Sequence, residues 1–319
     1  MSTKNKKVLI TGGCGYVGTK LIDFLVHDYD KIINIDTQWF GNYLKESNNL
    51  VNIKGDIRNI NDFESLFEGV EVVIHLANIA NDPSVDLDQT LSWEVNVLSA
   101  YKLAELCLNK GVKKIIYASS GSVYGVKNEK DVTEDLSLEP ISTYNKTKMV
   151  AERVLMSFNK NIIVNCIRPA TVCGLSPRMR FDVAVNMLTY QSIVNKELTV
   201  FGGEQVRPNI HIDDLINVYK FFLESDFESG YYNAGFENNS ILELAKAISN
   251  VNESSIKILE SNDPRSYRLS SNKILNLGFK PQKKISDAIL EVSGAIRNNK
   301  NIVHPSCFTV DWMKKNNFK

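Results

Sequence analysis

The sequence lacks the features that would assign it to a membrane or secreted protein. No apolar run reaches the roughly 18 residues that a membrane-spanning helix requires. The N-terminus, MSTKNKK, leads directly into VLITGG, without the apolar core and cleavage site of a signal peptide. We therefore expect a cytoplasmic protein that has no membrane partner.

An excess of one charge and a pattern of paired cysteines are also missing. The 37 basic residues equal the 37 acidic residues, so no net charge favours binding to nucleic acid. The five cysteines are scattered, odd in number and without a C-x-x-C pair. This arrangement predicts neither a disulfide framework nor a metal site, and it is typical of a reducing compartment.

The first half of the chain alternates short apolar runs with segments of helical length. Continuous runs rich in β-branched residues indicate strands that are buried on both faces, as in a parallel sheet. Repeated strand–helix alternation predicts an α/β fold, with a Rossmann-type doubly wound parallel sheet. The expected strands are residues 6–13, 32–36, 50–56, 70–77, 113–120 and 162–170.

A glycine-rich turn, TGGCGYVG at residues 11–18, follows the first expected strand. Glycines in such a turn let a pyrophosphate approach the backbone closely, and the free N–H groups of the following helix bind phosphate. A purely structural turn is the alternative. The strand–turn–helix setting favours a dinucleotide site that includes Gly12, Gly15, Tyr16, Val17 and Gly18.

Asp36 ends the second expected strand, where a carboxylate can accept both hydroxyls of the adenosine ribose. Such a carboxylate would repel a 2′-phosphate. The next residues, Thr37-Gln38-Trp39, supply no cation to hold that phosphate. The pattern therefore predicts NAD as the cofactor, with Asp36 and Gln38 in its site. An aspartate that merely caps a turn is the alternative.

Tyr144 and Lys148 are four residues apart, so they share one face of a helix. A phenol has a pKa near 10 in water, and a neighbouring ammonium and a positively charged nicotinamide ring would lower it. Lys148 could also hold the nicotinamide ribose, and Ser120 could hydrogen-bond the substrate oxygen. Tyr16 and Lys20 have the same spacing. Tyr144, however, follows a strand end, where ligands collect, so we interpret Ser120, Tyr144 and Lys148 as catalytic. An exposed helical tyrosine is the alternative.

These residues together resemble the extended short-chain dehydrogenase/reductase family, in particular its NAD-dependent epimerases and dehydratases of nucleotide sugars. The segments HLA at 75–77 and GDIR at 55–58 are similar to stretches of that family that contact the cofactor. The resemblance implies that Asp56, Ile57, Leu76 and Ala77 bind NAD and that Asn96 lies near the substrate. Residues 39–42, WFGN, are similar to a stretch that lies against adenosine in the dehydratases.

The second half of the chain carries segments that resemble the family's substrate-binding part. RPNIHIDD at 207–214 implies that Arg207 contacts the substrate diphosphate, and RSYR at 265–268 implies a second phosphate contact from Arg265 or Arg268. Surface salt bridges are the alternative for each of these arginines. The resemblance thus implies a nucleotide-sugar substrate.

One segment departs from the family pattern. In RPATVCG at 168–174, Thr171 replaces an asparagine that touches the nucleotide sugar. Arg178 and Arg180 then add two cations near the expected sugar or pyrophosphate. We therefore expect Thr171, Arg178 and Arg180 to bind substrate, although not in the manner of the best-known members.

The alternation of apolar runs and helical segments ends at about residue 172, and a loop-rich stretch follows up to residue 209. Helical patterns recur at 213–224 and 240–251, and a closing helix is expected within 280–296. We predict an NAD-binding Rossmann domain at 1–174. Residues 175–319 would form a smaller mixed α/β C-terminal lobe that mainly binds the nucleotide sugar, and segments of it can return to the first domain.

A second departure from the family pattern bears on the reaction. Dehydratases normally carry Asp and Glu after the catalytic hydroxyl residue, whereas this chain has Gly121 and Ser122, which cannot do acid–base work at neutral pH. A 4,6-dehydratase is therefore disfavoured. We expect Tyr144 to take the proton of a sugar hydroxyl, at C4, while hydride passes to NAD.

The outcome of that oxidation is left open by the residues. We lean towards net oxidation, with a GDP-linked manno-configured sugar or heptose, used for capsule assembly, as the candidate substrate. A 4-epimerase that works through a transient 4-keto sugar is the alternative. An inactive NAD-binding regulatory protein is a third hypothesis, which the intact Ser, Tyr and Lys disfavour. The resemblance also implies a homodimer packed through helices at 93–110 and 144–158.

Overall fold

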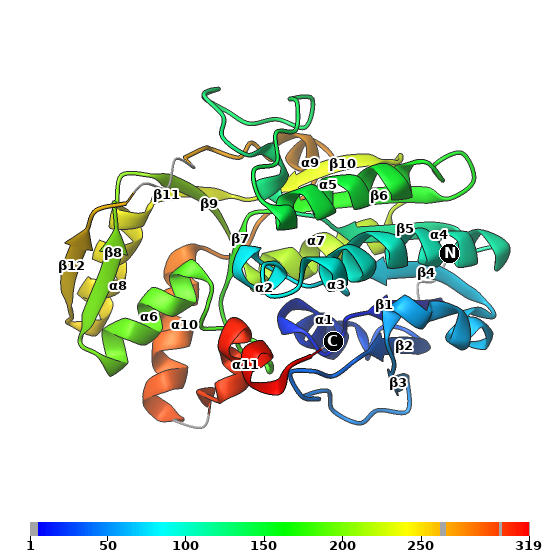
Figure 1. Ribbon diagram of the computed structural model, residues 1–319, viewed down its shortest axis with the longest axis horizontal. Coiled ribbons are helices and arrows are strands. Elements are labelled where there is room, and N and C mark those ends of the chain that lie inside the picture. The colour runs from blue at the N-terminus through cyan, green and yellow to red at the C-terminus, as the bar shows by residue number, and fades with distance from the viewer. Residues whose placement is uncertain (1–5, 262–265, 300–301, 319) are drawn as a thin grey trace.

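A seven-stranded sheet dominates the computed structural model, which describes residues 6–261, 266–299 and 302–318 (Figure 1). Its strand order is β10-β6-β5-β4-β1-β2-β3, and every neighbouring pair is parallel. This confirms the predicted α/β fold with a doubly wound sheet. The strands are β1 (Lys7–Thr11), β2 (Lys31–Asp36), β3 (Leu50–Lys54), β4 (Val70–His75), β5 (Lys114–Ala118), β6 (Ile163–Pro169) and β10 (Gly230–Ala234).

Both faces of this sheet are buried, which explains the continuous apolar runs. Val8 and Ile10 point into one apolar core, together with α1 (Tyr16–Leu25) and α7 (Ile212–Glu224). Leu9 points into a second core, together with α4 (Ser99–Asn109) and α5 (Thr143–Met156). Because successive strand residues face opposite sides of a sheet, an apolar residue is needed at every position.

The connections of the first half contain several short helical segments. The helix expected to begin at Trp93 is not one continuous α-helix. Trp93 ends α3, a π-helical turn follows, and α4 begins after it. Such π turns are rare insertions into α-helices, and sequence periodicity does not reveal them. The segments are a 3₁₀ stretch at Ile57–Phe67, α2 (Asp82–Val85), α3 (Gln89–Trp93), the π turn Glu94–Leu98 and a 3₁₀ turn at Gly121–Tyr124.

The second half forms a smaller mixed α/β group of elements at the left of the sheet in Figure 1. One three-stranded sheet has the order β11-β9-β7, and β12 pairs with β8. A third apolar core lies between these strands and three helices. The elements are β7 (Thr171–Cys173), α6 (Ala184–Val194), β8 (Glu197–Phe201), β9 (Val206–His211), β11 (Glu237–Ser240), α8 (Ile241–Asn252), β12 (Ser255–Leu259) and α10 (Ile285–Asn298), whereas α9 (Asn272–Asn276) lies beside β10 (Figure 1).

Two elements from the second half belong to the main sheet layer. β10 extends the sheet beside β6, and α7 packs against β5. The sequence Gly-Tyr-Tyr-Asn-Ala of β10 has no β-branched residue, which is why sequence reasoning expected no strand there. The division of the chain at residue 174 stays a prediction.

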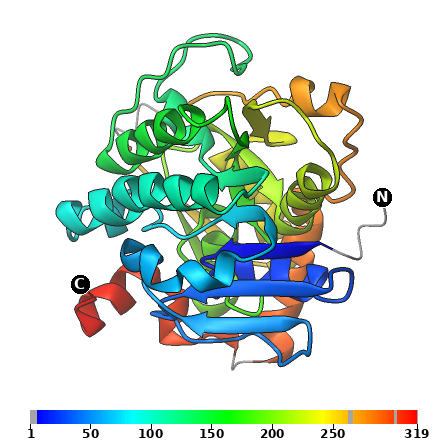
Figure 2. The same cartoon turned by 90° about the vertical axis from the view of Figure 1, so that its right-hand side faces the viewer.

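The last described segment runs back to the first half of the chain. It contains a 3₁₀ turn at Pro305–Cys307 and α11 (Thr309–Asn316). In both Figure 1 and Figure 2 the red C-terminal helix lies beside elements of the N-terminal half, and α11 contacts α2. Among the residues that the structure describes, no helix combines the length and apolar character needed to cross a bilayer.

Candidate active site

A cavity of about 440 Å³ lies at the carboxyl ends of the central strands. Most of the residues predicted from the sequence line it, and they come from both halves of the chain. Those lining residues are Gly12, Gly15, Tyr16, Val17, Gly18, Asp36, Asp56, Ile57, Leu76, Ala77, Ser120, Tyr144, Thr171, Arg178 and Arg180. The fold therefore brings one connected set of predicted groups to the edge where ligands bind in doubly wound sheets.

The glycine loop is shaped by close approaches of backbone. Gly12 has a φ of +78°, and a Cβ there would lie 2.5 Å from the Ala77 nitrogen. A Cβ on Gly18 would lie 2.4 Å from the Gly12 carbonyl oxygen. Because the loop carries no side chain at these points, helix α1 begins directly beside the cavity, and the N–H groups of its first turn can bind phosphate. The loop thus fits a dinucleotide cofactor.

Asp36 ends β2 and is held by backbone donors. Its Oδ2 accepts a hydrogen bond from the Cys14 nitrogen at 2.9 Å, and its Oδ1 accepts one from the Gln38 nitrogen at 2.6 Å. Burial raises the pKa of Asp36, and both hydrogen bonds and the positive charge of Arg178 oppose that rise. Each carboxylate oxygen has a second lone pair, so Asp36 can still accept hydroxyls of a ribose.

Ser120, two residues after β5, lies near Tyr144 and Lys148, which are both on α5. Tyr144 and Ser120 share a side-chain hydrogen bond. Ser120 also contacts Ser122, with 2.7 Å between the two hydroxyl oxygens. Behind the cavity wall, Lys148 Nζ donates to the Ala118 carbonyl oxygen at 2.7 Å and lies 5.9 Å from the centre of the Tyr144 ring.

The electrostatics of Tyr144 differ from the prediction. Burial raises the pKa of Tyr144 to about 12, while the Ser120 hydrogen bond and the positive charge of Arg180 lower it. Lys148 was expected to supply that positive charge, but burial lowers its own pKa to about 7. Within the protein, Arg180 is therefore the cation that favours the phenolate.

Helix α5 is anchored to the sheet by a buried ion pair. Arg168 on β6 donates from Nε and Nη2 to the two carboxylate oxygens of Glu152, both at 2.8 Å. Both side chains are almost fully buried. Because Glu152 lies one turn after Lys148, this pair fixes the helix that carries Tyr144.

Two predicted residues lie outside the cavity wall and have other partners. The Gln38 side chain does not line the cavity, and this residue contributes its backbone N–H to Asp36. Asn96 is fully buried; its Oδ1 accepts from the Ile79 nitrogen at 2.8 Å and its Nδ2 donates to Thr147 Oγ1 at 3.1 Å. The polar atoms of Asn96 connect the loop after β4 to α5, and the predicted ligand contacts of Gln38 and Asn96 stay predictions.

Of the three arginines predicted to bind phosphate in the second half, the two that the structure describes do not line the cavity. Arg207 lies on β9 and donates from Nη1 to the Val206 carbonyl oxygen at 3.3 Å. Arg268 is exposed and does not line the cavity. Arg265 lies outside the described residues. Neither Arg207 nor Arg268 lines the cavity, and their role as phosphate ligands stays a prediction.

The two arginines of the 178–180 segment occupy different places. Arg180 donates from Nε to Asp182 Oδ1 at 2.8 Å and lies near Tyr144. Arg178 is buried, with its guanidinium carbon 4.3 Å from the centre of the Phe40 ring and its charge acting on Asp36. Arg178 thus lies beside Asp36 and Phe40, and its predicted contact with substrate stays a prediction.

Several lining residues were not foreseen. Asp82 accepts a hydrogen bond from Ser142 at 2.5 Å, and its charge opposes ionisation of Tyr144. Tyr267, Thr309 and Met313 complete the wall from the end of the chain. Tyr267 lies within the RSYR segment singled out from the sequence. Nothing in the local sequence of Asp82, Thr309 or Met313 indicates a site, because tertiary contacts bring them there.

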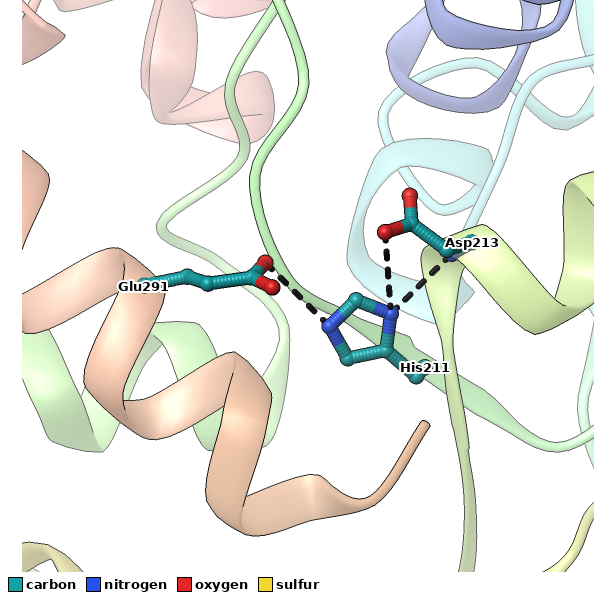
Figure 3. Close-up of side chains that lie close together, drawn as sticks. All are labelled: His211, Asp213 and Glu291. Atoms are coloured by element: carbon teal, nitrogen blue, oxygen red, sulfur yellow. Dashed lines mark hydrogen bonds and ion pairs between the residues drawn. The ribbon is translucent and has the colours of Figure 1, made fainter. Parts of the chain in front are cut away.

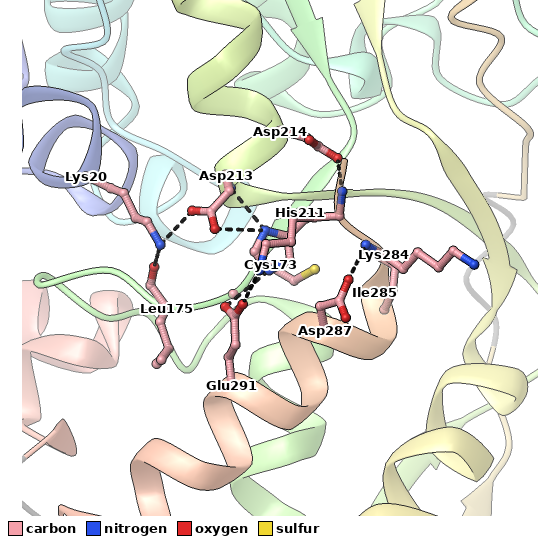
Figure 4. A network of polar contacts seen from close by, with 12 residues as sticks. Lys20, Cys173, Leu175, His211, Asp213, Asp214, Lys284, Ile285, Asp287 and Glu291 are labelled. Carbon is pink, nitrogen blue, oxygen red and sulfur yellow. Dashed lines mark hydrogen bonds and ion pairs between the residues drawn. The ribbon is translucent and has the colours of Figure 1, made fainter. Parts of the chain in front are cut away.

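A polar junction joins the glycine-loop helix to the second half, away from the cavity. His211 accepts at Nδ1 from the Asp213 nitrogen at 3.1 Å, and its Nε2 lies 3.3 Å from Glu291 Oε2 (Figure 3). Lys20 on α1 pairs with Asp213 at 2.6 Å and donates to the Leu175 carbonyl oxygen (Figure 4). These contacts hold α1, α7 and α10 in fixed relation.

The same three residues could geometrically hold a metal ion, since one ligand atom from each of His211, Asp213 and Glu291 lies within 4.8 Å of the others. Asp213, however, already pairs with Lys20, and Glu291 pairs with Lys283 at 2.9 Å. The lysines balance the carboxylate charges, which favours a structural ion network at this place.

Comparison with known proteins gives consistent matches. A family model described as "NAD dependent epimerase/dehydratase family" matches residues 8–235. A Bacillus subtilis (strain 168) protein described as "Uncharacterized UDP-glucose epimerase YtcB" is 33% identical over 225 residues, which cover 66% of this chain and 70% of that protein.

Solved structures of 4-epimerases share the fold over almost their whole length. UDP-N-acetylglucosamine 4-epimerase from Methanobrevibacter ruminantium M1, in complex with UDP-N-acetylmuramic acid, is 27% identical with a TM-score of 0.85. UDP-glucuronic acid 4-epimerase from Bacillus cereus, in complex with UDP-glucuronic acid and NAD, is 27% identical with a TM-score of 0.81. Each match covers 92% of this chain and 99% of the other chain.

Proposed function

The chain belongs to the NAD-dependent epimerase/dehydratase family, whose model matches residues 8–235, and we propose that it is a nucleotide-sugar 4-epimerase. In this proposal Tyr144 takes the proton of the C4 hydroxyl and later returns a proton to the same oxygen. Ser120 donates a hydrogen bond to that oxygen. Bound NAD would supply the acceptor, and then the donor, of the C4 hydride.

The observation that carries the proposal is the placement of Ser120 and Tyr144 on the same cavity as the glycine loop. A tyrosine can act as a base only where its phenolate is stabilised. Arg180 and the Ser120 hydroxyl both lower the pKa of Tyr144 against the effect of burial. We assign to Lys148 and the Arg168–Glu152 pair the task of holding α5 in register with β5.

The residues after Ser120 support epimerisation over dehydration. Gly121 and Ser122 form the start of a 3₁₀ turn, and Ser122 donates its hydroxyl to Asn145 Oδ1 at 2.6 Å. Neither residue can protonate a leaving hydroxyl at C6 or take a proton from C5. The 4-keto sugar would therefore keep its C6 hydroxyl and either receive hydride again or leave.

Net C4 oxidation is the second candidate function. The observation that favours it is Thr171, which lines the cavity where the family has an asparagine in contact with the nucleotide sugar. The three relatives named above have UDP-linked sugars in their descriptions. We therefore give UDP sugars first place, and the GDP-linked manno-configured sugar expected from the sequence has no support among those three.

A panel of UDP, dTDP, GDP and CDP sugars, incubated with enzyme and NAD, tests these functions. Proton NMR of the sugar should show a new C4 epimer, without net absorbance at 340 nm. NADH that accumulates in proportion to the sugar consumed would instead establish a dehydrogenase. If no nucleotide sugar reacts or raises the melting temperature, both enzymatic proposals fail in favour of a regulatory protein that binds NAD alone.

A further inference from the structure

The segment 302–318 lies against the cofactor side of the cavity, far in sequence from the glycine loop. Thr309 and Met313, both on α11, line the cavity together with Asp36, Trp39 and Phe40. Asp36 and the glycine loop define the adenosine end of the site. The chain thus places its last described helix over the end of the cavity that would hold the adenosine of NAD.

Three contacts attach this segment to the loop that follows Asp36. Trp312 Nε1 donates to the Trp39 carbonyl oxygen at 2.7 Å. The Phe318 ring stacks on the Trp39 ring, with 4.9 Å between centroids and 3° between planes. The hydroxyl oxygens of Tyr43 and Ser306 lie 3.2 Å apart. Because Trp39 and Phe40 line the cavity, these contacts fix part of its wall.

Arg178 connects the same segment to the interior of the site. Its Nη2 lies 3.3 Å from both the Ser306 carbonyl oxygen and Thr309 Oγ1, and its guanidinium covers the Phe40 ring. Its side chain is almost fully buried, and its Nε has no hydrogen-bond partner among the residues that the structure describes. A buried donor without a partner is costly, so this N–H group, on a residue that lines the cavity, points to an acceptor on the ligand.

We propose that residues 302–318 and Arg178 form a clasp over the adenosine half of NAD. Arg178 donates to an oxygen of the adenosine diphosphate, and the segment 302–318 holds Trp39 and Phe40 against it. Release of NAD then requires the clasp to separate from the Trp39 loop. The cofactor is therefore retained through many turnovers, which an epimerase tolerates because each cycle regenerates NAD. The clasp itself depends only on NAD binding and not on the sugar reaction.

The test measures cofactor release from the holoenzyme, in the absence of any sugar. Protein loaded with radiolabelled NAD is diluted into excess unlabelled NAD, and the retained label is followed by rapid gel filtration. Trp312→Phe removes the donated hydrogen bond and keeps an aromatic ring, and Phe318→Ala removes the ring stack on Trp39 together with the edge contact to Phe40. We expect each to release label roughly five- to tenfold faster, the factor that one such contact gives. Arg178→Met keeps an apolar side chain over Phe40, and we expect a larger increase, of roughly tenfold or more.

Lys314→Ala is the matched control, because Lys314 is exposed on the same helix. We expect its release rate to stay within about twofold of the wild-type rate, as for most surface substitutions. Melting temperatures of the NAD-free variants show whether each variant is folded. If Trp312→Phe does not fold, the release rate of Phe318→Ala decides the test. Equal release rates for wild type and all folded variants would overturn the clasp. An unchanged release rate in Arg178→Met would overturn the proposed contact between Arg178 and NAD.

Discussion

The two walls of the cavity are built in different ways. The wall at the strand ends consists of the glycine loop, Asp36 and Ser120, which lie at the ends of parallel strands, and Tyr144 in the first turn of α5. The facing wall carries two arginines, Arg178 and Arg180, which lie on the loop between β7 and α6. It also carries Thr309 and Met313 of α11, which reach the cavity through contacts that span most of the chain. The first wall supplies the reacting and cofactor-binding groups, and the second supplies the positive charge that adjusts them.

Substitutions in the two walls should therefore change different measured properties. Loss of a group from the strand wall should abolish chemistry or cofactor binding. Loss of a charge from the facing wall should shift a pH profile or a release rate while the reaction persists. The following variants test that division.

The largest effect is expected from Tyr144→Phe, which removes the proposed base. We expect the turnover number to fall by about 10²–10⁴-fold, the usual contribution of a positioned acid–base group. NAD binding, measured by the shift in melting temperature, should persist. Tyr101→Phe is the control, because Tyr101 is 44% exposed on α4. If Tyr144→Phe turned over at the wild-type rate, the strand wall would not supply the base.

Two alanine substitutions in helices test the close packing of the glycine loop. In Gly18→Ala the new Cβ would meet backbone at 2.4 Å, whereas in Gly294→Ala it meets nothing within 4 Å. Overpacking of this kind costs about 1–3 kcal/mol, so the NAD affinity of Gly18→Ala should drop by about tenfold or more. Gly294→Ala, within α10, should stabilise the fold by about 0.5–1 kcal/mol. Titration calorimetry and thermal melts give both values, and equal NAD affinities would contradict the packing argument.

Arg180→Met tests the facing wall. Arg180 lowers the pKa of Tyr144, so its loss should raise that pKa and move the rise of the pH–rate profile to higher pH, by roughly one unit. Arg180→Lys keeps the charge and should keep the profile near that of the wild type. A profile that does not move in Arg180→Met, in an enzyme that still turns over, would show that another group sets the ionisation of Tyr144.

The smallest effect is expected in the stability of the NAD-free protein. Burial lowers the pKa of Lys148 from 10.5 to about 7. Between these pH values the unfolded chain binds a proton that the folded protein does not, so stability from this group rises with pH over that window. Lys148→Met should remove that rise. Urea unfolding at a series of pH values measures it, and parallel pH dependences of wild type and variant would contradict the burial of a neutral amine.

Sequence reasoning identified the strand wall because its information is local. The motif TGGCGYVG and the strand-end Asp36 each adjoin a strand whose apolar pattern is clear, and the Tyr144–Lys148 pair is recognised by its spacing on one helix. The sheet was predictable for the same reason, apart from β10, whose Gly-Tyr-Tyr-Asn-Ala sequence lacks β-branched residues.

The facing wall was not predictable in detail. The contact between Trp39 and Trp312 spans 273 residues, and no periodicity connects them. Arg178 and Arg180 are two residues apart, yet one lies on Phe40 and the other pairs with Asp182. The charge that acts on Tyr144 was assigned to Lys148 from spacing, whereas burial of that lysine decided otherwise.

A structure of the protein with NAD and its nucleotide sugar would test the central claim most directly. The distance to measure joins Tyr144 Oη to the C4 hydroxyl oxygen of the sugar. We predict a hydrogen bond of about 2.6–3.2 Å, with Ser120 Oγ contacting the same oxygen. A sugar bound with its C4 hydroxyl beyond the reach of Tyr144, and with another side chain at that oxygen, would contradict the account.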